Sequence, residues 1–395
     1  MSGGVDSSVA VDVLKRAGYE VVGVTCIFQD NEKSHNAARD AARVCERMGI
    51  THQVVQCAPA FDEKVIAAFV HDYATGLTPS PCVGCNAYMK FPALIDAADK
   101  LDCDYVATGH YARVTQTPSG RYAIKRALDV RKDQSYMLCL LTQEQLSRVI
   151  FPLGGMTKTE VRLRASELGL EVAEKPESQD VCFIEGNYRD FLSTRGVEDA
   201  PGLIVDTAEK ELGRHRGLFN YTVGQRKGIG IASSEPYYVI EKRPQDNTVV
   251  VGYARDALIS SAVVENINWQ AIAGIDEAAP TGVVPTDDAP TDDAPTGVVL
   301  TDDAPTDDAP TDDAPADDSH AAGAPARETH AVPQEFMVKL RYRSVGAACT
   351  LEHTRDGRYE VCLQSPQPTT APGQFAVFYR GDTLIGGGMI VEVGK

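Results

Sequence analysis

The first half of the chain alternates between two hydrophobic patterns. Apolar residues three and four positions apart predict amphipathic helices, and short runs rich in Val, Ile and Thr predict strands buried on both faces. The helical pattern occurs at residues 7–17, 34–48, 61–75, 86–100 and 160–168. The strand pattern occurs at residues 20–28, 52–57 and 105–108. Because alternating strands and helices are typical of a parallel sheet covered on both faces, we expect an α/β fold with a doubly wound parallel sheet at residues 1–186.

Short strands and glycine-containing turns replace the helices from about residue 187 onward. The first group of predicted strands covers residues 202–206, 237–241 and 248–251. The second group covers residues 336–343, 359–363, 376–379 and 389–393. The pattern therefore predicts two small β-rich domains after the α/β domain, a central one at residues 187–256 and a C-terminal β-barrel at residues 257–395.

A low-complexity insert at about residues 275–332 interrupts the last predicted domain. The motif Thr-Asp-Asp-Ala-Pro recurs from residue 286 to 310, is interrupted at 296–300, and continues to 318. Proline blocks helices and ladders, and paired aspartates repel one another. We therefore expect the insert to be disordered. A neutral repeat expansion in a surface loop is the simpler interpretation, and an acidic interaction segment is the alternative.

The chain opens with a glycine-rich stretch suited to phosphates. Residues 2–8 read Ser-Gly-Gly-Val-Asp-Ser-Ser, and the first helical pattern follows at once. Glycine allows close approach to a ligand, and the N–H groups of the turn and the helix start favour an anion. The lysine of the Gly-x4-Gly-Lys-Ser/Thr loop is absent here. The stretch resembles the PP-loop, Ser-Gly-Gly-x-Asp-Ser, of ATP pyrophosphatases, whose fold is adenine nucleotide alpha hydrolase-like; a turn that only caps a helix is the simpler alternative.

A doubly wound fold places such a loop at the carboxyl end of a strand. In this sequence Met1 directly precedes the loop. We therefore expect the sheet to lack the strand that would lead into the loop.

Composition and charge indicate where in the cell the protein is expected, but they do not identify its binding partner. The net charge is −18, but residues 276–330 alone contribute −14, so the remainder carries only about −4 and can present a basic face to a nucleic acid. The sequence has neither a run of 18 apolar residues nor a secretory signal pattern. Its ten cysteines are scattered, which suits reduced thiols. We expect a cytoplasmic protein without a membrane segment.

Two cysteine motifs are candidates for chemistry. Cys82 and Cys85 form a Cys-x-x-Cys pair, which by itself fits half a zinc site, a redox pair, part of an iron–sulfur site or an accident. Cys182 lies in the apolar stretch 181–184, where a single cysteine is usually part of a core.

Together these motifs give a specific resemblance. They are the opening loop, Pro-Cys-x-x-Cys-Asn…Lys-Phe at 81–91, Thr-Gly-His-Tyr-Ala at 108–112, Lys-Asp-Gln-Ser-Tyr at 132–136, Cys-Phe-Ile at 182–184, Tyr-Thr-Val-Gly-Gln-Arg-Lys-Gly at 221–228 and Pro-Gly-Gln-x-Ala-Val-Phe-Tyr at 372–379. In this order they resemble the tRNA-specific 2-thiouridylase family, bacterial enzymes that replace O2 of the wobble uridine with sulfur. The resemblance covers nearly the whole chain except the acidic insert.

The resemblance implies roles for individual residues. The residues implied to bind ATP are Ser2, Gly3, Gly4, Val5, Asp6, Ser7, Ser8, Cys26 and Gly109. Cys85 corresponds to the nucleophile and Cys182 to the persulfide carrier. The residues implied to contact the target base or the rest of the tRNA are Ser80, Pro81, Cys82, Lys132, Asp133, Gln134, Arg341 and Tyr342. Ser80 departs from the Asn-Pro-Asp or Asn-Pro-Cys loop often found in relatives. Asp6 is a candidate Mg²⁺ ligand, directly or through water.

The implied reaction begins with ATP-dependent adenylation of O2 and ends with persulfide sulfur transfer. The implied partners are the tRNAs for Lys, Glu and Gln, and a cysteine desulfurase or sulfur-carrier protein as donor. Three alternatives stay open at this point. Cys82, Cys85 and Cys182 could hold an iron–sulfur cluster. The chain could be a PP-loop ligase that adenylates another substrate, or a truncated, inactive relative.

Overall fold

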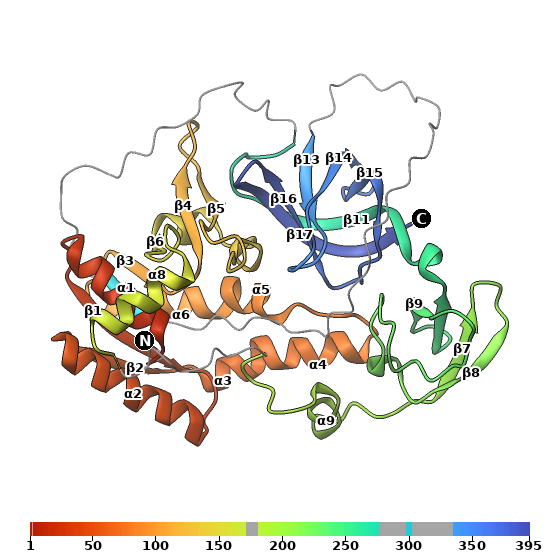
Figure 1. Ribbon diagram of the computed structural model, residues 1–395, viewed down its shortest axis with the longest axis horizontal. Coiled ribbons are helices and arrows are strands. Elements are labelled where there is room, and N and C mark those ends of the chain that lie inside the picture. Colours follow the sequence, from red (N-terminus) through yellow and green to blue (C-terminus); the bar gives the residue numbers. More distant parts are fainter. Residues whose placement is uncertain (2, 171–180, 276–297, 302–334) are drawn as a thin grey trace.

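The computed structural model describes residues 1, 3–170, 181–275, 298–301 and 335–395, with the backbone alone at 299–301. An α/β part lies at one end of the molecule and two β-rich parts at the other (Figure 1). The fold class predicted from the hydrophobic pattern is therefore confirmed. Most of the insert and residues 171–180 lie outside the described residues.

The α/β part is built on a five-stranded parallel sheet with the order β2-β1-β12-β3-β6. Its strands are β1 (Val21–Ile27), β2 (His52–Gln56), β3 (Tyr105–Thr108), β6 (Val149–Ile150) and β12 (Val298–Thr301). Most of β1 is buried, as its nearly continuous apolar sequence predicts for a strand covered on both faces. The carboxyl ends of these parallel strands lie along one edge, where such folds bind ligands.

The strand β12 comes from the insert that the sequence predicts to be disordered. Its backbone pairs with β1 on one side and β3 on the other, and the Val298 N–H donates to the Glu20 carbonyl at 2.9 Å. Val298 is fully buried. The prediction of disorder is therefore wrong for these four residues, which occupy the place between β1 and β3 where we expected no strand.

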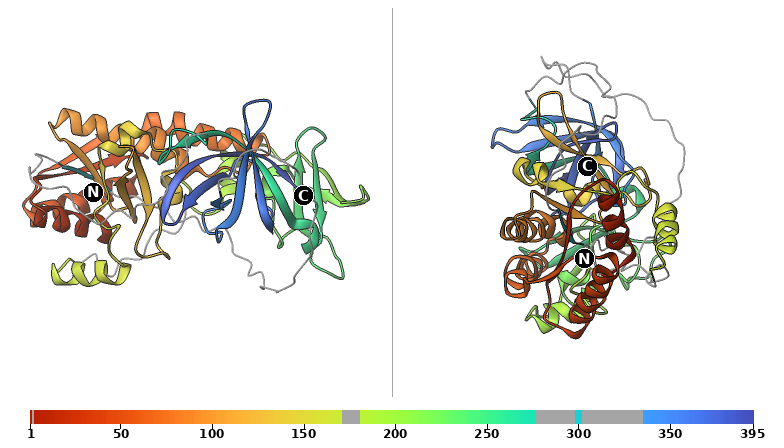
Figure 2. Two further views of the ribbon diagram at one scale, coloured as in Figure 1. Left: turned by 90° about the horizontal axis from the view of Figure 1, so that it is seen from above. Right: turned by 90° about the vertical axis from the view of Figure 1, so that its left-hand side faces the viewer.

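Helices cover both faces of the sheet (Figure 2). The helices that contact the sheet include α1 (Val5–Arg16), α2 (Glu32–Met48) and α6 (Phe91–Lys100). Further helices are α7 (Gln143–Ser147), α8 (Lys158–Glu167), which packs on α1, and α9 (Tyr188–Thr194). The helix α1 buries Val9, Ala10 and Leu14. The helix α2 begins at Asn31, whose side chain accepts from the Ser34 N–H at 2.9 Å, and ends at Gly49 in the left-handed conformation.

Two of the predicted helices contain π-helical turns. The helix predicted at 61–75 consists of α3 (Ala58–Phe61), the π-turn η1 (Asp62–Ile66) and α4 (Ala67–Ala74). The helix predicted at 86–100 begins earlier, with α5 (Pro81–Cys85), and continues through the π-turn η2 (Asn86–Lys90) into α6. The Phe91 N–H donates to the carbonyl of Asn86, as in a π-helix, and not to that of Ala87. The next residue, Pro92, has no N–H with which to donate to the Tyr88 carbonyl.

The central β-rich part is a four-stranded sheet with the order β8-β7-β10-β9. Its strands are β7 (Gly202–Asp206), β8 (Glu211–His215), β9 (Tyr238–Arg243) and β10 (Thr248–Gly252). A small core lies beneath it, formed around Ile204, Val239 and Val249.

The C-terminal β-rich part is an eight-stranded sheet in which β11 pairs with both β15 and β17. Its own strands are β11 (Leu258–Trp269), β13 (Phe336–Lys339), β14 (Ala347–His353), β15 (Tyr359–Pro368), β16 (Phe375–Arg380) and β17 (Thr383–Gly394). The α/β part contributes the hairpin β4 (Ala112–Gln116) and β5 (Tyr122–Arg126), which joins the sheet where Thr383 pairs with Lys125. The strand predicted at 336–343 is too long, because β13 ends at Lys339. Among the described residues, the structure has no helix long and apolar enough to cross a membrane.

Candidate active site

The phosphate loop leads directly into α1. Gly3 has a φ of +69°, and a Cβ there would lie 2.7 Å from the Cβ of Asp40, so this position requires glycine. Gly4 is the N-cap of α1, and within the described part of the chain no side chain caps this helix start. The first-turn N–H groups and the helix dipole therefore face the place where the PP-loop prediction puts phosphate. The predicted residue Ser2 lies outside the described residues.

The two loop serines support the turn. Both are buried, and the Ser8 hydroxyl donates to the Gly4 carbonyl at 2.7 Å, with the Ser7 hydroxyl 3.4 Å from the same oxygen. Val5 is buried beside them. In this structure the hydroxyls therefore stabilise the loop, and their predicted contact with ATP stays a prediction.

Asp6 is held by two residues that sequence analysis missed. Its carboxylate accepts from the Lys158 ammonium at 2.7 and 2.8 Å and from the Tyr111 hydroxyl at 2.9 Å. Lys158 is the first residue of α8, whose start is fixed by the capping box of Thr157 and Glu160. A cation thus lies beside the phosphate loop, although the loop itself has no lysine. The motif Thr-Gly-His-Tyr-Ala did contain Tyr111, but no local pattern pointed to Lys158.

Cys26 and Gly109, the other predicted ATP contacts, lie at the carboxyl edge of the sheet. Cys26 is near the end of β1, and Gly109 directly follows β3. A hydrogen bond to the Cys57 thiol, together with burial, raises the pKa of Cys26 well above its ordinary value. Cys26 is therefore a neutral thiol, consistent with a packing role for its side chain and a binding role for its backbone.

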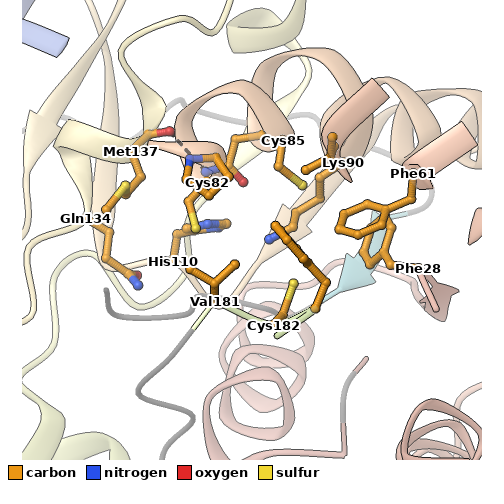
Figure 3. Close-up of a pocket in the computed structure, with 14 residues that line it drawn as sticks. Phe28, Phe61, Cys82, Cys85, Lys90, His110, Gln134, Met137, Val181 and Cys182 are labelled. Carbon is orange, nitrogen blue, oxygen red and sulfur yellow. Dashed lines mark hydrogen bonds between the residues drawn. The ribbon is translucent and has the colours of Figure 1, made fainter. Parts of the chain in front are cut away.

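A pocket next to this edge contains all three predicted cysteines (Figure 3). Its lining residues are Phe28, Phe61, Val65, Pro81, Cys82, Cys85, Asn86, Lys90, His110, Gln134, Met137, Val181, Cys182 and Phe183. Figure 3 shows the sulfur atoms of Cys85 and Cys182 directed toward the same space. The structure therefore brings together two thiols that are far apart in the sequence, and neither is in a disulfide bond.

Cys182 lies in an exposed turn and not in a core strand. The turn is closed by the Ile184 N–H, which donates to the Val181 carbonyl at 3.0 Å. Phe183 anchors it, with its ring centroid 5.7 Å from that of Phe61 and 5.1 Å from that of Phe69. The core-packing interpretation of Cys182 is wrong, because its neighbour Phe183 supplies the packing and leaves the thiol accessible.

The polar groups of the pocket have defined protonation and orientation. Burial, with a smaller effect of the Lys90 cation, lowers the pKa of His110 well below its ordinary value, so the imidazole is neutral. The Asn86 amide donates to the Met137 carbonyl at 3.0 Å, the bond drawn as a dashed line in Figure 3. Sequence analysis included Asn86 and Lys90 only as letters of the cysteine motif and gave them no role.

The loop that precedes Cys82 is fixed by both β-rich parts. Ser80 is buried as the N-cap of α5, and Pro81 is the first residue of that helix. Upstream, the Lys242 ammonium donates to the Leu77 carbonyl at 3.2 Å and lies 3.3 Å from the Thr78 hydroxyl oxygen. Thr78 also donates its N–H to the Pro372 carbonyl at 2.9 Å and accepts at its own carbonyl from Gln374 at 2.8 Å. All three parts of the chain therefore meet at Thr78, a junction that the sequence did not predict.

The predicted tRNA contacts at 132–134 differ in accessibility. Asp133 is buried, and its carboxylate accepts from the Ala127 N–H and from the N–H and hydroxyl of Ser135. Gln134 lines the pocket and accepts from the Tyr111 N–H at 2.8 Å. Lys132 is partly exposed. In this conformation Asp133 holds the loop in place, and the contacts of all three residues with tRNA stay predictions.

Arg341 and Tyr342 lie in a turn beyond β13, and not in the strand we predicted. The turn is closed by the Ser344 N–H, which donates to the Arg341 carbonyl at 3.1 Å. The Tyr342 ring lies 5.9 Å from that of Tyr136, and partial burial lowers the pKa of Arg341. Both residues therefore approach the motif at 132–136, although they come from a different domain.

The described residues do not form a metal centre. No three His, Cys, Asp or Glu side chains among them are gathered closely enough to hold a metal ion. Cys82, Cys85 and Cys182 thus do not fit a three-ligand cluster as arranged. Because Lys158 already engages both carboxylate oxygens of Asp6, Mg²⁺ ligation by Asp6 stays a prediction.

The chain combines a glycine loop at a helix start, a parallel sheet and a pocket next to the carboxyl edge of that sheet, where folds of this kind bind their ligands. These features define a nucleotide-using α/β enzyme with two appended β domains. Three family descriptions match the chain: "tRNA methyl transferase HUP domain" at residues 1–186, "tRNA methyl transferase PRC-barrel domain" at 189–253 and "Aminomethyltransferase beta-barrel domain" at 322–390.

Full-length relatives carry a more specific name. The chain is 36% identical to the tRNA-specific 2-thiouridylase MnmA of Lachnoclostridium phytofermentans, over 99% of this chain and 98% of that protein. It is 40% identical to the proteins of the same name from Chloroflexus aurantiacus, over 99% and 97%, and from Synechococcus sp., over 100% and 96%. The chain belongs to the tRNA-specific 2-thiouridylase family.

Proposed function

We propose that this chain is an ATP-dependent tRNA sulfurtransferase that converts the wobble uridine to 2-thiouridine. The observation that carries this proposal is the pocket shared by Cys85 and Cys182, whose lining residue His110 directly precedes Tyr111, the residue that donates to Asp6 of the phosphate loop. Family membership supports the reaction, and the described structure supports the arrangement of the groups. The substrates would be the tRNAs for Lys, Glu and Gln, and the sulfur would come from a cysteine desulfurase or a sulfur-carrier protein.

The first step makes O2 of the uracil a leaving group. The oxygen attacks the α-phosphorus of ATP, an O–P bond forms, and pyrophosphate leaves. The N–H groups at the start of α1 stabilise charge on the phosphates, with Lys158 as a nearby cation. Mg²⁺ is the expected counter-ion of the nucleotide, with Asp6 as its predicted ligand.

The second step transfers sulfur. Cys182 carries a persulfide, whose outer sulfur attacks C2 and displaces AMP. The Cys85 thiolate then attacks the inner sulfur of Cys182, which forms a Cys85–Cys182 disulfide and releases the 2-thiouridine as its thiolate. An external thiol reductant returns two electrons to the disulfide. The exposed turn of Cys182 suits a residue that must first meet the protein that donates sulfur.

The experiment is nucleoside mass analysis of unmodified tRNA after incubation with the full chain, Mg-ATP, a cysteine desulfurase and cysteine. We expect 2-thiouridine, absent without ATP, and no methylated uridine. Cys85→Ser and Cys182→Ser should each abolish the product but keep ATP and tRNA binding, whereas Cys362→Ser, on β15, is the matched control. A Cys182→Ser protein that still transfers persulfide sulfur would overturn the assignment. ATP turnover that survives prior digestion of the tRNA would indicate a ligase for another substrate.

A further inference from the structure

The polar edge of the thiol pocket comes from one helical turn. Asn86 and Lys90 begin and end the π-turn η2, both are buried, and both line the pocket. Cys85 immediately precedes this turn. The groups on η2 therefore face the same space as the reactive thiols.

The Asn86 amide is oriented with its oxygen unsatisfied. Its NH₂ group donates to the Met137 carbonyl at 3.0 Å, which fixes which end of the amide is the oxygen. Asn86 is 3% exposed, and its Oδ1 finds no hydrogen-bond donor among the described residues. A buried acceptor without a donor is rare in native proteins, and in a residue that lines a pocket it is a candidate partner for a donor on a ligand.

Lys90 adds a hydrogen-bond donor to the acceptor that Asn86 provides. It is 5% exposed, and the described residues that line the pocket include no other lysine and no arginine, aspartate or glutamate. Figure 3 shows the Lys90 side chain directed toward the space between the two thiols. Besides His110 and Gln134, the pocket thus offers the Asn86 acceptor and the Lys90 donor between walls formed by aromatic rings such as Phe28 and Phe61.

An acceptor and a donor side by side match the Watson–Crick edge of uracil. An unstacked base is read through hydrogen bonds to its Watson–Crick edge and apolar contact with its faces. Uracil presents the N3–H donor between two carbonyl acceptors, whereas cytosine presents an acceptor at N3 and an amine beside it. We infer that Asn86 Oδ1 accepts the N3–H of the target uridine while the Lys90 ammonium donates to an adjacent carbonyl oxygen. The inference rests on the proposed function, because it assumes that a tRNA base enters this pocket.

The pair would make Asn86 a specificity-determining residue. A bound cytosine would place its N3 lone pair against the Asn86 oxygen and its amine against a cation. Sites built to hydrogen-bond a substrate group reject analogues that lack it, because the buried polar groups are then left unpaired. Asn86 cannot serve as a base, since an amide oxygen is too weakly basic, so its role is to select and orient the uracil.

The test compares the affinity of the full chain for three anticodon stem-loop RNAs that differ only in the target base: uridine, cytidine or 3-methyluridine. We expect the native chain to bind the uridine RNA about tenfold or more tightly than either analogue. Asn86→Leu should lower affinity for the uridine RNA and leave the analogues nearly unchanged, so that the preference disappears. Asn36→Leu, an exposed asparagine on α2, is the matched control and should keep the preference. Asn86→Asp keeps an acceptor and should retain part of the preference.

The outcomes separate this inference from the proposed function. Equal binding of the three RNAs by the native chain overturns the inference, as does an Asn86→Leu protein that remains folded and keeps the native preference. A purely structural role of Asn86 would lower affinity for all three RNAs equally and also overturns it. If the base preference depends on Asn86 but no 2-thiouridine forms in the thiolation assay, the proposed function fails and the recognition of uracil stands.

Discussion

Both carboxylate oxygens of Asp6 accept hydrogen bonds from the single ammonium group of Lys158, at 2.8 and 2.7 Å. The Lys158 side chain is 11% exposed and that of Asp6 is 22% exposed, so solvent screens the pair only in part. The pair joins the start of α1 to the start of α8 and places a cation at the phosphate loop. Its energetic coupling and its role toward ATP can be measured separately.

A double-mutant cycle tests this pair. We expect Asp6→Asn and Lys158→Met each to lower the free energy of unfolding by about 1–3 kcal/mol, because each leaves a partly buried charge unpaired. The double variant should lose less than the sum, with a coupling of about 1–2 kcal/mol in urea unfolding. Strict additivity would contradict the pairing. If Asp6 is instead the Mg²⁺ ligand, Asp6→Asn alone should abolish the Mg²⁺ dependence of ATP binding.

The strand β12 offers a second prediction. Val298→Pro removes the N–H that donates to the Glu20 carbonyl and places proline in a central strand. We expect the free energy of unfolding to fall by about 3 kcal/mol or more, together with a loss of ATP affinity, because α1 contacts β12. The sequence Thr-Gly-Val-Val at 296–299 also occurs at 281–284, so Val283→Pro is the matched control. Equal melting temperatures for the two variants would show that β12 is dispensable.

Lys242 predicts a dependence of stability on pH. Burial lowers its pKa from 10.5 to about 8. Between these values the unfolded chain binds more protons than the folded chain, so stability should rise with pH above about 8, and below that the penalty for burying the charge is constant. We expect the unfolding free energy of the native chain, relative to Lys242→Met, to increase by on the order of 1 kcal/mol between about pH 7.5 and 9.5. Lys100→Met, which alters an exposed lysine, should show no such trend.

We expect Lys90 to favour the reaction of the pocket thiols with anionic reagents over neutral ones. A cation in a pocket with little water should attract an anionic reagent more than a neutral one. We expect the ratio of the rates at which iodoacetate and iodoacetamide alkylate Cys85 and Cys182 to fall about three- to tenfold in Lys90→Met, as measured by peptide mass spectrometry. The ratio is informative because the fraction of thiolate affects both reagents equally. An unchanged ratio in a folded Lys90→Met protein would place the ammonium away from the thiols.

The local pattern predicted much of the fold. The strand at 105–108 and the N-terminal phosphate loop agree with the structure because a few neighbouring residues define them. The π-turn at Asn86 was missed because it is a shift in backbone hydrogen bonding, which the spacing of apolar residues does not reveal. The turn at Arg341 was missed because alternating apolar residues continue past the end of β13.

Residues of the candidate site could be predicted from the sequence only where they belong to a recognised motif. Cys85 and Cys182 were found through the resemblance to a family, but neither spacing nor composition placed them in one pocket. The apolar neighbours of Cys182 suggested burial, but Val181, Phe183 and Ile184 pack against the aromatic cluster while Cys182 itself is exposed. The role of Asp133 in supporting its loop could not be predicted, because the sequence of a motif does not reveal that a charged residue in it is buried.

By itself, the sequence determined the class of fold, the phosphate loop, the order of the motifs and the family, because periodicity and short motifs are properties of neighbouring residues. The tertiary structure alone decided that Lys158 meets Asp6, that Val298 enters the parallel sheet and that the Asn86 oxygen in the thiol pocket has no hydrogen-bond donor among the described residues. These relationships join residues far apart in the chain or depend on the complete surroundings of one atom. They are fixed by the packing of whole elements, in which burial and hydrogen-bond satisfaction are settled together, and no local pattern of residues encodes that outcome.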